Sequence, residues 1–375
     1  MAKGSLINLV ELEALVESKL ADTSLAPAHF DYYRGGACDE ITLKRNCQAY
    51  QELSVWPRML VDISKRSMSL NLFGQQLDMP ILIAPTAFQG LAHERGELAS
   101  AAAASRLNTV MTLSTLSNYS IEEVADAATP VNDSKNGHHL WYQLYVYKDR
   151  AITKELVARA EASGYQALVV TVDSPMLGRR ERDVHNHFTL PVGLRAANLE
   201  NFALDKIDKS QEDSGLASYI ASLYDTSLTW KDLEWIISLT NLPTLVKGVL
   251  RPDDALRAIE CGVKGIIVSN HGGRQVDTTI STIEALPSVV AAVESKVEVL
   301  LDGGIRRGTD VLKALALGAK AVMIGRPVLW GLALSGESGV ETVLNLLKSE
   351  FDLAMGLCGC ANLTEITSDL VSKNK

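Results

Sequence analysis

The sequence is short of cysteine, and the cysteines it has are not arranged as a disulfide framework. Among its 375 residues there are five, at positions 38, 47, 261, 358 and 360. An odd number of cysteines that mostly lie far apart is typical of a chain kept in a reducing compartment. We therefore expect a cytoplasmic protein without structural disulfides.

Long apolar runs and an excess of positive charge are also missing. No stretch approaches the ~20 consecutive apolar residues that a membrane span requires. Lys and Arg number 36 against 45 Asp and Glu, a net charge of −9, which disfavours binding to nucleic acid. The first five residues do not read as a secretory signal, and the last four lack a Ser-Lys-Leu peroxisomal address. We expect neither a membrane nor a nucleic acid as partner.

Three kinds of binding motif are absent as well. The chain has no Gly-Lys dipeptide and hence no Walker motif, and no G-x-G-x-x-G follows an expected strand. Cys358 and Cys360, like His185 and His187, lack the further ligands that a metal needs, so we expect no metal site. The remaining composition, 47% hydrophobic and 22% charged, is that of an ordinary globular protein with two domains or one large barrel.

From residue 79 onward, short apolar runs alternate with segments of helical composition, which predicts a parallel α/β fold. Eight strand ends are separated by seven intervals, six of which are 24 to 31 residues long, about the size of one βα unit. The ends are taken at Pro85, Ser114, Tyr145, Asp173, Lys247, His271, Asp302 and Arg326. Eight units favour a closed (β/α)₈ barrel, a TIM barrel, over an open doubly wound sheet. The runs are Pro80–Pro85, Thr109–Ser114, Leu140–Val146, Ala167–Val172, Thr244–Lys247, Gly265–Ser269, Val297–Leu301 and Ala321–Ile324.

We interpret the whole chain, residues 1–375, as one domain. Residues 1–78 are expected to form N-terminal helices, over the first 66 residues, followed by a hairpin that turns at Gly74. Residues 79–335 are expected to form the barrel. Residues 336–375 are expected to form a C-terminal helix and a tail. The remaining interval, 74 residues from Asp173 to Lys247, carries an insertion of roughly 45 residues, about 185–230, after the fourth strand. Because it follows the carboxyl end of a strand, we expect a lid over the site; a surface insertion without function is the alternative.

Polar side chains gather where the expected strands end, and in such a barrel the chemistry lies at the carboxyl ends of the strands. Three strands end with two polar residues spaced two apart, so that both point to the same face. A fourth ends with Lys247 after apolar residues, a costly place for a charge unless it meets an anion or a polar ligand. The three pairs are Gln143 with Tyr145, Thr171 with Asp173, and Ser269 with His271.

The densest of these clusters is Ser269-Asn270-His271-Gly272-Gly273-Arg274-Gln275. Histidine is the natural general base near neutral pH, and an arginine three residues later can clamp a carboxylate. Asp173 could pair with the His271 imidazole and favour its protonated form. Arg180, in a second basic cluster, could supply another contact to a carboxylate.

Glycine and arginine after the last two strands indicate a phosphate site. Asp302-Gly303-Gly304-Ile305-Arg306-Arg307-Gly308 and Gly325-Arg326-Pro327 occupy the loops where this class of barrel commonly binds phosphate. Glycine lets backbone N–H groups come close to an anion, and arginine adds a two-pronged donor. Ordinary glycine turns with solvated arginines are the alternative.

Taken together, these motifs resemble the FMN-dependent 2-hydroxy acid oxidases and dehydrogenases, the family of glycolate oxidase and L-lactate oxidase. The resemblance covers nearly the whole chain in order. Besides the Ser269–Gln275 cluster, it rests on Phe30-Asp31-Tyr32-Tyr33, Ile83-Ala84-Pro85-Thr86-Ala87, Gln143-Leu144-Tyr145-Val146-Tyr147, Thr171-Val172-Asp173, Leu177-Gly178-Arg179-Arg180, Leu245-Val246-Lys247-Gly248 and Leu301-Asp302-Gly303-Gly304.

The resemblance implies a barrel that binds FMN at the strand ends, oxidises small 2-hydroxy acids, and assembles as a homotetramer. His271 would be the base, with Asp173, Tyr145 and Arg274 as the other catalytic residues. The substrate would be bound by Tyr32, Tyr145, Arg180, His271, Arg274 and Leu116. The cofactor would be bound by Pro85, Thr86, Ala87, Ser114, Gln143, Thr171, Lys247, Ser269, Asp302, Gly303, Gly304, Arg306, Gly325 and Arg326.

Leu116 is a departure from this resemblance, because plant glycolate oxidases have tryptophan there. The smaller side chain leaves room beside the substrate's β-carbon, and filling that room with a methyl group could gain ~1 kcal/mol or more. We therefore expect L-lactate to be favoured, with glycolate also oxidised and O₂ as acceptor, giving a 2-oxo acid and H₂O₂.

Several alternatives stay open at this point. A dehydrogenase of the same fold could pass its electrons to a quinone or cytochrome, or the enzyme could be mainly a glycolate oxidase. A nucleotide dehydrogenase of the inosinate type would need a cysteine at a strand end, and none is expected there. A scaffold without catalytic activity would take up no FMN.

Overall fold

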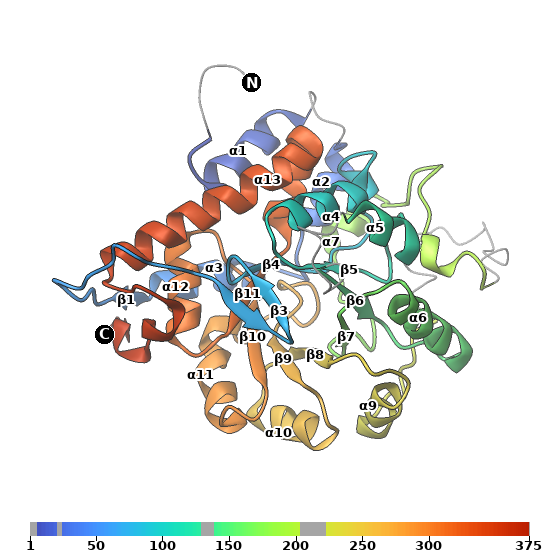
Figure 1. Ribbon diagram of the computed structural model, residues 1–375. Coiled ribbons are helices and arrows are strands. Elements are labelled where there is room, and N and C mark those ends of the chain that lie inside the picture. Colours follow the sequence, from blue (N-terminus) through green and yellow to red (C-terminus); the bar gives the residue numbers. More distant parts are fainter. Residues whose placement is uncertain (1–5, 21–24, 129–138, 203–222, 375) are drawn as a thin grey trace.

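The computed structural model describes residues 6–20, 25–128, 139–202 and 223–374, and its centre is a closed barrel of parallel strands (Figure 1). The order around the barrel is β4-β5-β6-β7-β8-β9-β10-β11, and β11 pairs with β4 to close it. Every strand overlaps the run expected for it, which confirms the (β/α)₈ prediction. The strands are β4 Ile81–Ile83, β5 Met111–Leu113, β6 Leu140–Leu144, β7 Ala167–Thr171, β8 Thr244–Val249, β9 Gly265–Val268, β10 Glu298–Asp302 and β11 Ala321–Ile324.

Helices cover the outside of the barrel, which explains why its strands are apolar on both faces. All five residues of β7, for example, are buried. The helices that follow the strands are α4 Gly96–Arg106, α5 Ile121–Ala127, α6 Arg150–Ala162, α9 Trp230–Ile237, α10 Pro252–Glu260, α11 Thr282–Val293, α12 Gly308–Ala316 and α13 Arg326–Leu357.

The amino end of the barrel is plugged by the predicted hairpin, formed by β2 Leu70–Leu72 and β3 Gln75–Leu77. Their buried leucines belong to one apolar cluster with inward-facing strand residues such as Val169 and Ile267. Phe73 at the turn meets Trp141 of β6 edge to face, with ring centroids 5.7 Å apart. This plug leaves the carboxyl ends of the strands as the open end of the barrel.

The N-terminal segment contains three helices, α1 Leu9–Ser18, α2 Pro27–Arg34 and α3 Ile41–Gln51. The expectation that all of the first 66 residues are helical was wrong beyond α3. Strand β1 Leu53–Val55 pairs antiparallel with β12 Val371–Lys373, and residues 56–66 are without helix. The two partners are more than three hundred residues apart, and a local helix pattern does not reveal such a pairing.

Helix α13 is broken at Ser335 and Gly336, both of which have non-helical backbone angles. The break coincides with the boundary expected between the barrel and the C-terminal helix. Beyond it, Gly339 lies against Gly331, where an added Cβ would be 1.8 Å from the Gly331 carbonyl oxygen.

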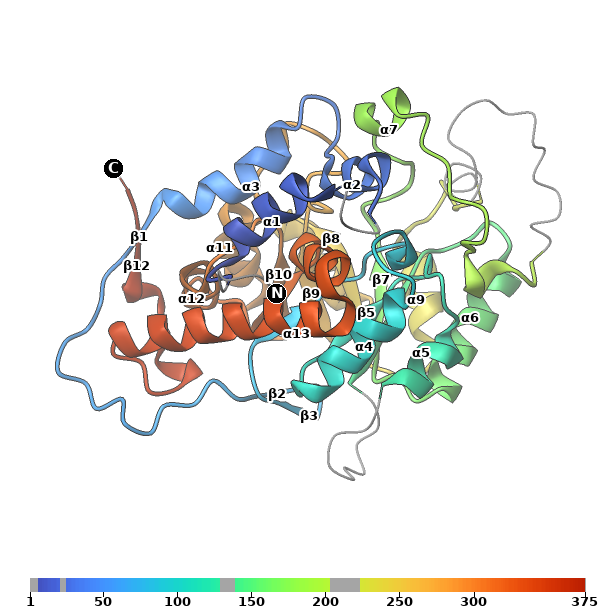
Figure 2. The ribbon, with the colours of Figure 1, turned by 90° about the horizontal axis from the view of Figure 1, so that it is seen from above.

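The insertion after β7 is described in part. Helix α7 Glu181–His185 and the short 3₁₀ turn Ala197–Leu199 lie before residues 203–222, which are outside the described residues. Figure 2 shows α7 beside α2, near the carboxyl end of the barrel. The lid over about 185–230 therefore stays a prediction. Within the described ranges, no helix is both long and apolar enough to cross a membrane.

Candidate active site

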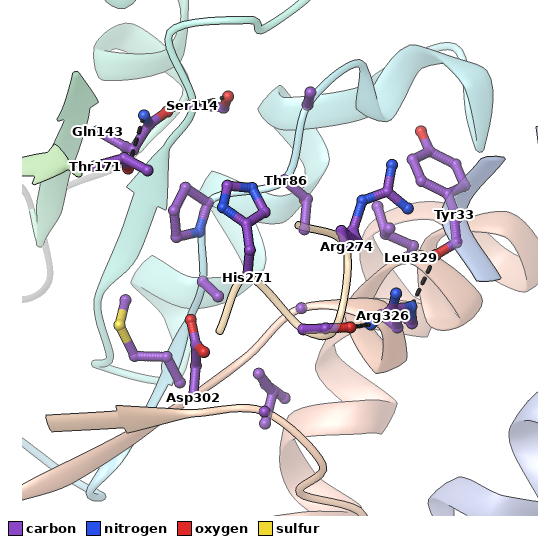
Figure 3. Close-up of a pocket in the computed structure, with 18 of the residues that line it drawn as sticks. Tyr33, Thr86, Ser114, Gln143, Thr171, His271, Arg274, Asp302, Arg326 and Leu329 are labelled. Carbon is purple, nitrogen blue, oxygen red and sulfur yellow. Dashed lines mark hydrogen bonds between the residues drawn. The ribbon is translucent and has the colours of Figure 1, made fainter. Parts of the chain in front are cut away.

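One pocket opens at the carboxyl ends of the strands, and the residues proposed from the sequence converge on it (Figure 3). Of the cofactor contacts expected from the sequence, all but Ser269 line it, and Asp173 stands just behind it. The substrate-side residues that line it are Tyr32, Leu116, Tyr145, Arg180, His271 and Arg274. The cofactor-side residues that line it are Pro85, Thr86, Ala87, Ser114, Gln143, Thr171, Lys247, Asp302, Gly303, Gly304, Arg306, Gly325 and Arg326.

His271 is held by three polar contacts. Its Nδ1 lies 2.8 Å from Oδ1 of Asp173 and 3.3 Å from Oγ of Ser174, and its backbone N–H donates to Ser269 Oγ at 3.1 Å. A carboxylate on Nδ1 places the proton of the neutral ring on that nitrogen. Nε2 is then left with its lone pair available to a molecule in the pocket.

The backbone around this pair is unusual. His271 has a left-handed conformation, with φ of 57°, directly after the end of β9. In β8, Gly248 forms a bulge with φ of 111°, and a Cβ there would be 2.5 Å from Cβ of Asp173. The bulge therefore creates the space that Asp173 occupies beside the imidazole.

Burial sets the protonation of this pair. Burial lowers the pKa of His271 below its usual value, although Asp173 acts in the opposite direction. Burial would raise the pKa of Asp173, but the charges of His271 and Lys247 hold it below its usual value. The imidazole is therefore neutral and able to accept a proton near pH 7, beside a carboxylate that stabilises the protonated ring.

Lys247 brings a buried positive charge to the pocket from β8, the strand that pairs with β9. Its Nζ lies 3.0 Å from Asp302 Oδ2 and donates to Ser269 Oγ at 3.0 Å. Burial would lower the pKa of Lys247, but Asp302 and Asp173 raise it, so the ammonium stays charged. Ser269 thus lies behind the pocket and holds both Lys247 and His271; its expected contact with the cofactor stays a prediction.

Gln143 has a fixed orientation between two strands. Its Nε2 donates to Thr171 Oγ1 at 3.0 Å, and its Oε1 accepts from Ser114 Oγ at 3.3 Å and from the backbone N–H of Thr115 at 3.1 Å. Figure 3 shows Ser114, Gln143 and Thr171 side by side. These bonds align a row of polar groups along one wall of the pocket.

Two arginines, Arg180 and Arg274, line the pocket, and in the described part of the chain only Asp183 forms an ion pair with either of them. Arg274 donates to the backbone carbonyls of Tyr32 and Gly35, and its guanidinium lies 5.0 Å from the centre of the Tyr32 ring. Burial, together with the charge of Arg180, lowers the pKa of Arg274 to about 10. Arg180 has only Asp183 within ion-pair distance, at 3.9 Å, and its buried Nε finds no partner among the described residues. Two buried cations that repel each other favour an anionic ligand such as a carboxylate.

A second cationic group lies where the sequence predicts phosphate. Arg326 donates to the carbonyls of Tyr33, Gly272 and Gly35, which fix its guanidinium (Figure 3). Burial and the charges of Arg274 and Arg306 lower its pKa to about 9. An anion bound here would relieve that repulsion.

The neighbouring glycines Gly304 and Gly325 differ in why a side chain is excluded or tolerated at each position. At Gly304 a Cβ would lie 2.0 Å from the backbone oxygen of Asn46 in α3, so this glycine makes room for a helix. At Gly325 a Cβ would meet nothing nearer than Thr86 Cγ2 at 3.4 Å. Close approach to an anion is therefore open at Gly325, whereas Gly304 is required by packing.

These features fit FMN, the cofactor that the resemblance implies. Asp302 Oδ1 is buried and lacks a hydrogen-bond partner in the part of the chain that the structure describes, and it can accept from a ribityl hydroxyl. Arg306, Arg326 and Gly325 can hold the phosphate, and the wall of Thr86, Gln143 and Lys247 offers donors and acceptors to a polar ring system.

Some residues of the site escaped the analysis of the sequence. Tyr224 lines the pocket and stacks on Tyr145 with ring centroids 4.5 Å apart, but it lies within the expected insertion and at no strand end. Ser174 donates to Asp173 Oδ1 at 2.9 Å, and its position next to Asp173 was the one signal available. Phe88 and Leu329 also line the pocket with apolar side chains, and neither was proposed from the sequence.

Comparison with known proteins gives one consistent result. The family described as FMN-dependent dehydrogenase matches residues 21–373. The chain is 52% identical to an L-lactate oxidase from Nostoc sp. over 99% of both chains, and 50% identical to glycolate oxidase 3 of Arabidopsis thaliana over 96% of this chain and 94% of that one. A structure of mandelate oxidase with (S)-4-hydroxymandelic acid superposes with a TM-score of 0.88 at 40% identity, over 96% of this chain and 97% of that one.

Adjacent arginines provide a matched test of the phosphate assignment. Arg306 lines the pocket, whereas the half-exposed side chain of Arg307 points to Glu350 at 2.9 Å. We expect Arg306→Ala to weaken FMN binding by about tenfold or more, because a charge-assisted hydrogen bond to phosphate is lost. Arg307→Ala should leave the affinity unchanged. Titration of apoprotein with FMN, followed by flavin fluorescence, measures both, and equal affinities in the two variants would contradict the assignment.

Proposed function

The chain belongs to the FMN-dependent dehydrogenase family, and from that premise we propose that it prefers L-lactate to glycolate and uses O₂ as its electron acceptor. It is an enzyme that oxidises 2-hydroxy acids with FMN as cofactor. The observation that carries the proposal is the composition of one pocket. It is lined by His271, which Asp173 contacts from behind, by Arg180 and Arg274, and by a small apolar side chain, Leu116.

The cofactor supplies the redox chemistry of this reaction. When bound, FMN would supply the acceptor for the hydride, one proton with two electrons, that leaves the α-carbon of the substrate. Reduction of O₂ to H₂O₂ would then use these two electrons, this proton and the proton of the substrate hydroxyl. The chain's own residues then have three tasks, which are to bind the carboxylate, to remove the hydroxyl proton and to surround the substrate's side chain.

Carboxylate binding falls to Arg180 and Arg274. Their mutual repulsion in a buried site is relieved when a carboxylate binds between them. Arg274 is anchored by the carbonyls of Tyr32 and Gly35, so it does not need to be ordered on binding.

Proton removal falls to His271. Its Nε2 accepts the proton of the substrate hydroxyl, and Asp173 stabilises the resulting imidazolium through Nδ1 at 2.8 Å. Burial raises the pKa of Tyr145 to about 12, so its hydroxyl keeps its proton and can donate a hydrogen bond to the substrate. The charged Lys247 on the cofactor side can balance negative charge that develops there.

Substrate preference is assigned to Leu116. It is buried in the pocket wall, its N–H donates to Ser114 Oγ at 3.1 Å, and its carbonyl accepts from the N–H of Phe88 at 2.9 Å. The methyl group of L-lactate can contact this side chain, whereas glycolate has no methyl group. Both substrates present the same carboxylate and hydroxyl, so we expect both to be oxidised.

We also propose a homotetramer. Residues 56–66 lie along the end of α13, where Arg58 N–H donates to the Cys358 carbonyl and Arg66 pairs with Asp352 at 2.6 Å. Large apolar side chains are exposed on both segments, and such a patch is typical of a subunit interface. They are Trp56, Met59, Leu60, Leu353 and Leu357.

The reaction itself can be tested with L-lactate and O₂. We expect each molecule of O₂ consumed to yield one H₂O₂, and His271→Ala to lower kcat by a factor of about 100 or more while FMN stays bound, because proton removal is lost. An oxygen electrode and a coupled peroxide assay measure these quantities.

Two outcomes would contradict this proposal. Dye reduction without O₂ consumption would favour the quinone or cytochrome alternative. A near wild-type rate in His271→Ala would remove the assigned base.

Leu116→Trp tests the preference for L-lactate. The larger ring fills the space beside the substrate's β-carbon, so we expect kcat/KM for L-lactate relative to glycolate to fall by about tenfold, the scale of one methyl contact. Steady-state kinetics with both substrates measures the ratio. An unchanged ratio, with FMN still bound, would exclude Leu116 as the determinant.

The proposed tetramer can be tested by comparing substitutions at two fully exposed aliphatic residues. Leu60, in the proposed interface, and Val192, outside it, both have a relative exposure of 106%. We expect light scattering to give four subunits for the wild type and for Val192→Glu, and smaller species for Leu60→Glu, because a charge opposes burial at an interface. A monomeric wild type, or a tetrameric Leu60→Glu variant, would contradict this interface.

A further inference from the structure

Glu97 is a fully buried carboxylate that the proposed reaction does not use. It stands near the start of α4, outside the pocket, with an exposed fraction of 0%. Burial raises the pKa of Glu97 to about 7, although backbone hydrogen bonds act in the opposite direction. A buried carboxylate without a positively charged partner is costly, so its contacts call for an explanation.

Its contacts join two loops of the site. Oε1 of Glu97 accepts the backbone N–H of Gln89 at 3.0 Å and that of Asn118 at 3.1 Å. Gln89 belongs to the loop after β4, and Asn118 to the loop after β5. Oε2 is buried and has no partner in the described ranges, so one oxygen atom makes both bonds.

The first loop carries part of the cofactor wall. The Gln89 side chain donates from Nε2 to Thr86 Oγ1 at 3.0 Å and accepts from Ser100 Oγ at 2.6 Å. Thr86 lines the pocket, where Figure 3 shows it near His271. Glu97 therefore holds the backbone of the residue whose side chain positions Thr86.

The second loop carries Leu116. The Phe88 N–H donates to the Leu116 carbonyl at 2.9 Å, and the Gly90 N–H donates to Asn118 Oδ1 at 2.7 Å. These two bonds join the loops directly. They start from Phe88 and Gly90, the neighbours of Gln89, whose own N–H donates to Glu97. Three adjacent connections therefore set the distance between Thr86 and Leu116. Two of them are hydrogen bonds made directly between the two loops. The third is made by the side chain of Glu97, which belongs to α4 and to neither loop.

We propose that Glu97 is a positioning residue for substrate selectivity: its carboxylate fixes the loop that carries Leu116 relative to the loop that carries Thr86. It touches neither substrate nor cofactor. Without it, two buried N–H groups lose their acceptor, the loops separate, and Leu116 withdraws from the substrate's side chain.

The test compares selectivity in variants that differ in how much of the bridge they keep. Glu97→Gln retains an acceptor oxygen at the same reach, Glu97→Asp keeps the charge but shortens the reach, and Glu97→Ala removes both. Glu161→Ala is the matched control, because Glu161 also bridges α6 to the segment before β8, through Thr240 Oγ1 at 2.8 Å and Asn241 N–H at 3.3 Å, at the opposite end of the barrel.

We expect kcat/KM for L-lactate relative to glycolate to fall by about fivefold or more in Glu97→Ala and Glu97→Asp, a partial loss of one methyl contact. Glu97→Gln and Glu161→Ala should stay within about twofold of the wild type, since neither displaces Leu116. Thermal unfolding and FMN content are measured alongside, and the loss of a bridge lowers stability in Glu97→Ala and Glu161→Ala alike.

The inference would be overturned if both Glu97→Ala and Glu97→Asp kept the wild-type ratio of kcat/KM for L-lactate to kcat/KM for glycolate. It would also be overturned if Glu161→Ala changed this ratio as much as Glu97→Ala does. If Glu97→Ala does not fold, Glu97→Asp decides by itself. The inference rests on the proposed function, because its test uses the same two substrates. The experiment nevertheless distinguishes failure of the inference from failure of the proposed function. The wild-type ratio tests the preference for L-lactate, and the change between wild type and variant tests Glu97.

Discussion

The pairing of β11 with β4 closes the barrel, and every group of the site depends on that closure. In a closed parallel sheet, the carboxyl ends of all strands meet at one rim. Here the hairpin β2–β3 fills the other end with apolar side chains, so the polar residues at the rim have one direction to face. Residues as distant in sequence as Tyr32, Asp173 and Arg326 are thereby brought to one pocket or its immediate border.

Positive charge at this rim favours the binding of anions in the pocket. Lys247 has Asp302, and His271 has Asp173, so these pairs are satisfied within the protein. The arginines are not: Arg274 and Arg326 are buried among backbone carbonyls and other guanidinium groups, which lowers the pKa of each. A carboxylate at one end and a phosphate at the other would supply the missing charge, and this is the charge pattern of a 2-hydroxy acid bound beside FMN.

Side-chain hydrogen bonds between neighbouring elements make the same rim rigid. Gln143 is bonded to both neighbouring strands, and Glu97 bridges the next two loops from behind. A buried side chain that bonds to two elements at once restricts how far these elements can move apart. A pocket built in this way can discriminate a methyl group from a hydrogen, because its walls do not relax around the smaller substrate.

Most of the barrel could be predicted from the sequence because its signals are local. The apolar runs, the interval of one βα unit and the polar residues at strand ends are each read within a few residues, and His271, Asp173, Lys247 and the arginines at positions 306 and 326 were found in this way. The pairing of β1 with β12, the bulge at Gly248 and the stacking of Tyr224 on Tyr145 join segments that are distant in sequence or depend on backbone angles. No local pattern marks them.

The sequence by itself determined the fold class and the kinds of chemical group at the rim, since periodicity and residue type are properties of neighbours along the chain. Tertiary structure alone decided which atoms meet: that Ser269 lies behind Lys247 and His271, that Gly304 makes room for α3, and that Glu97 joins two loops. Those contacts follow from the closure and packing of the whole barrel, because only there do residues from separate βα units come within hydrogen-bond distance.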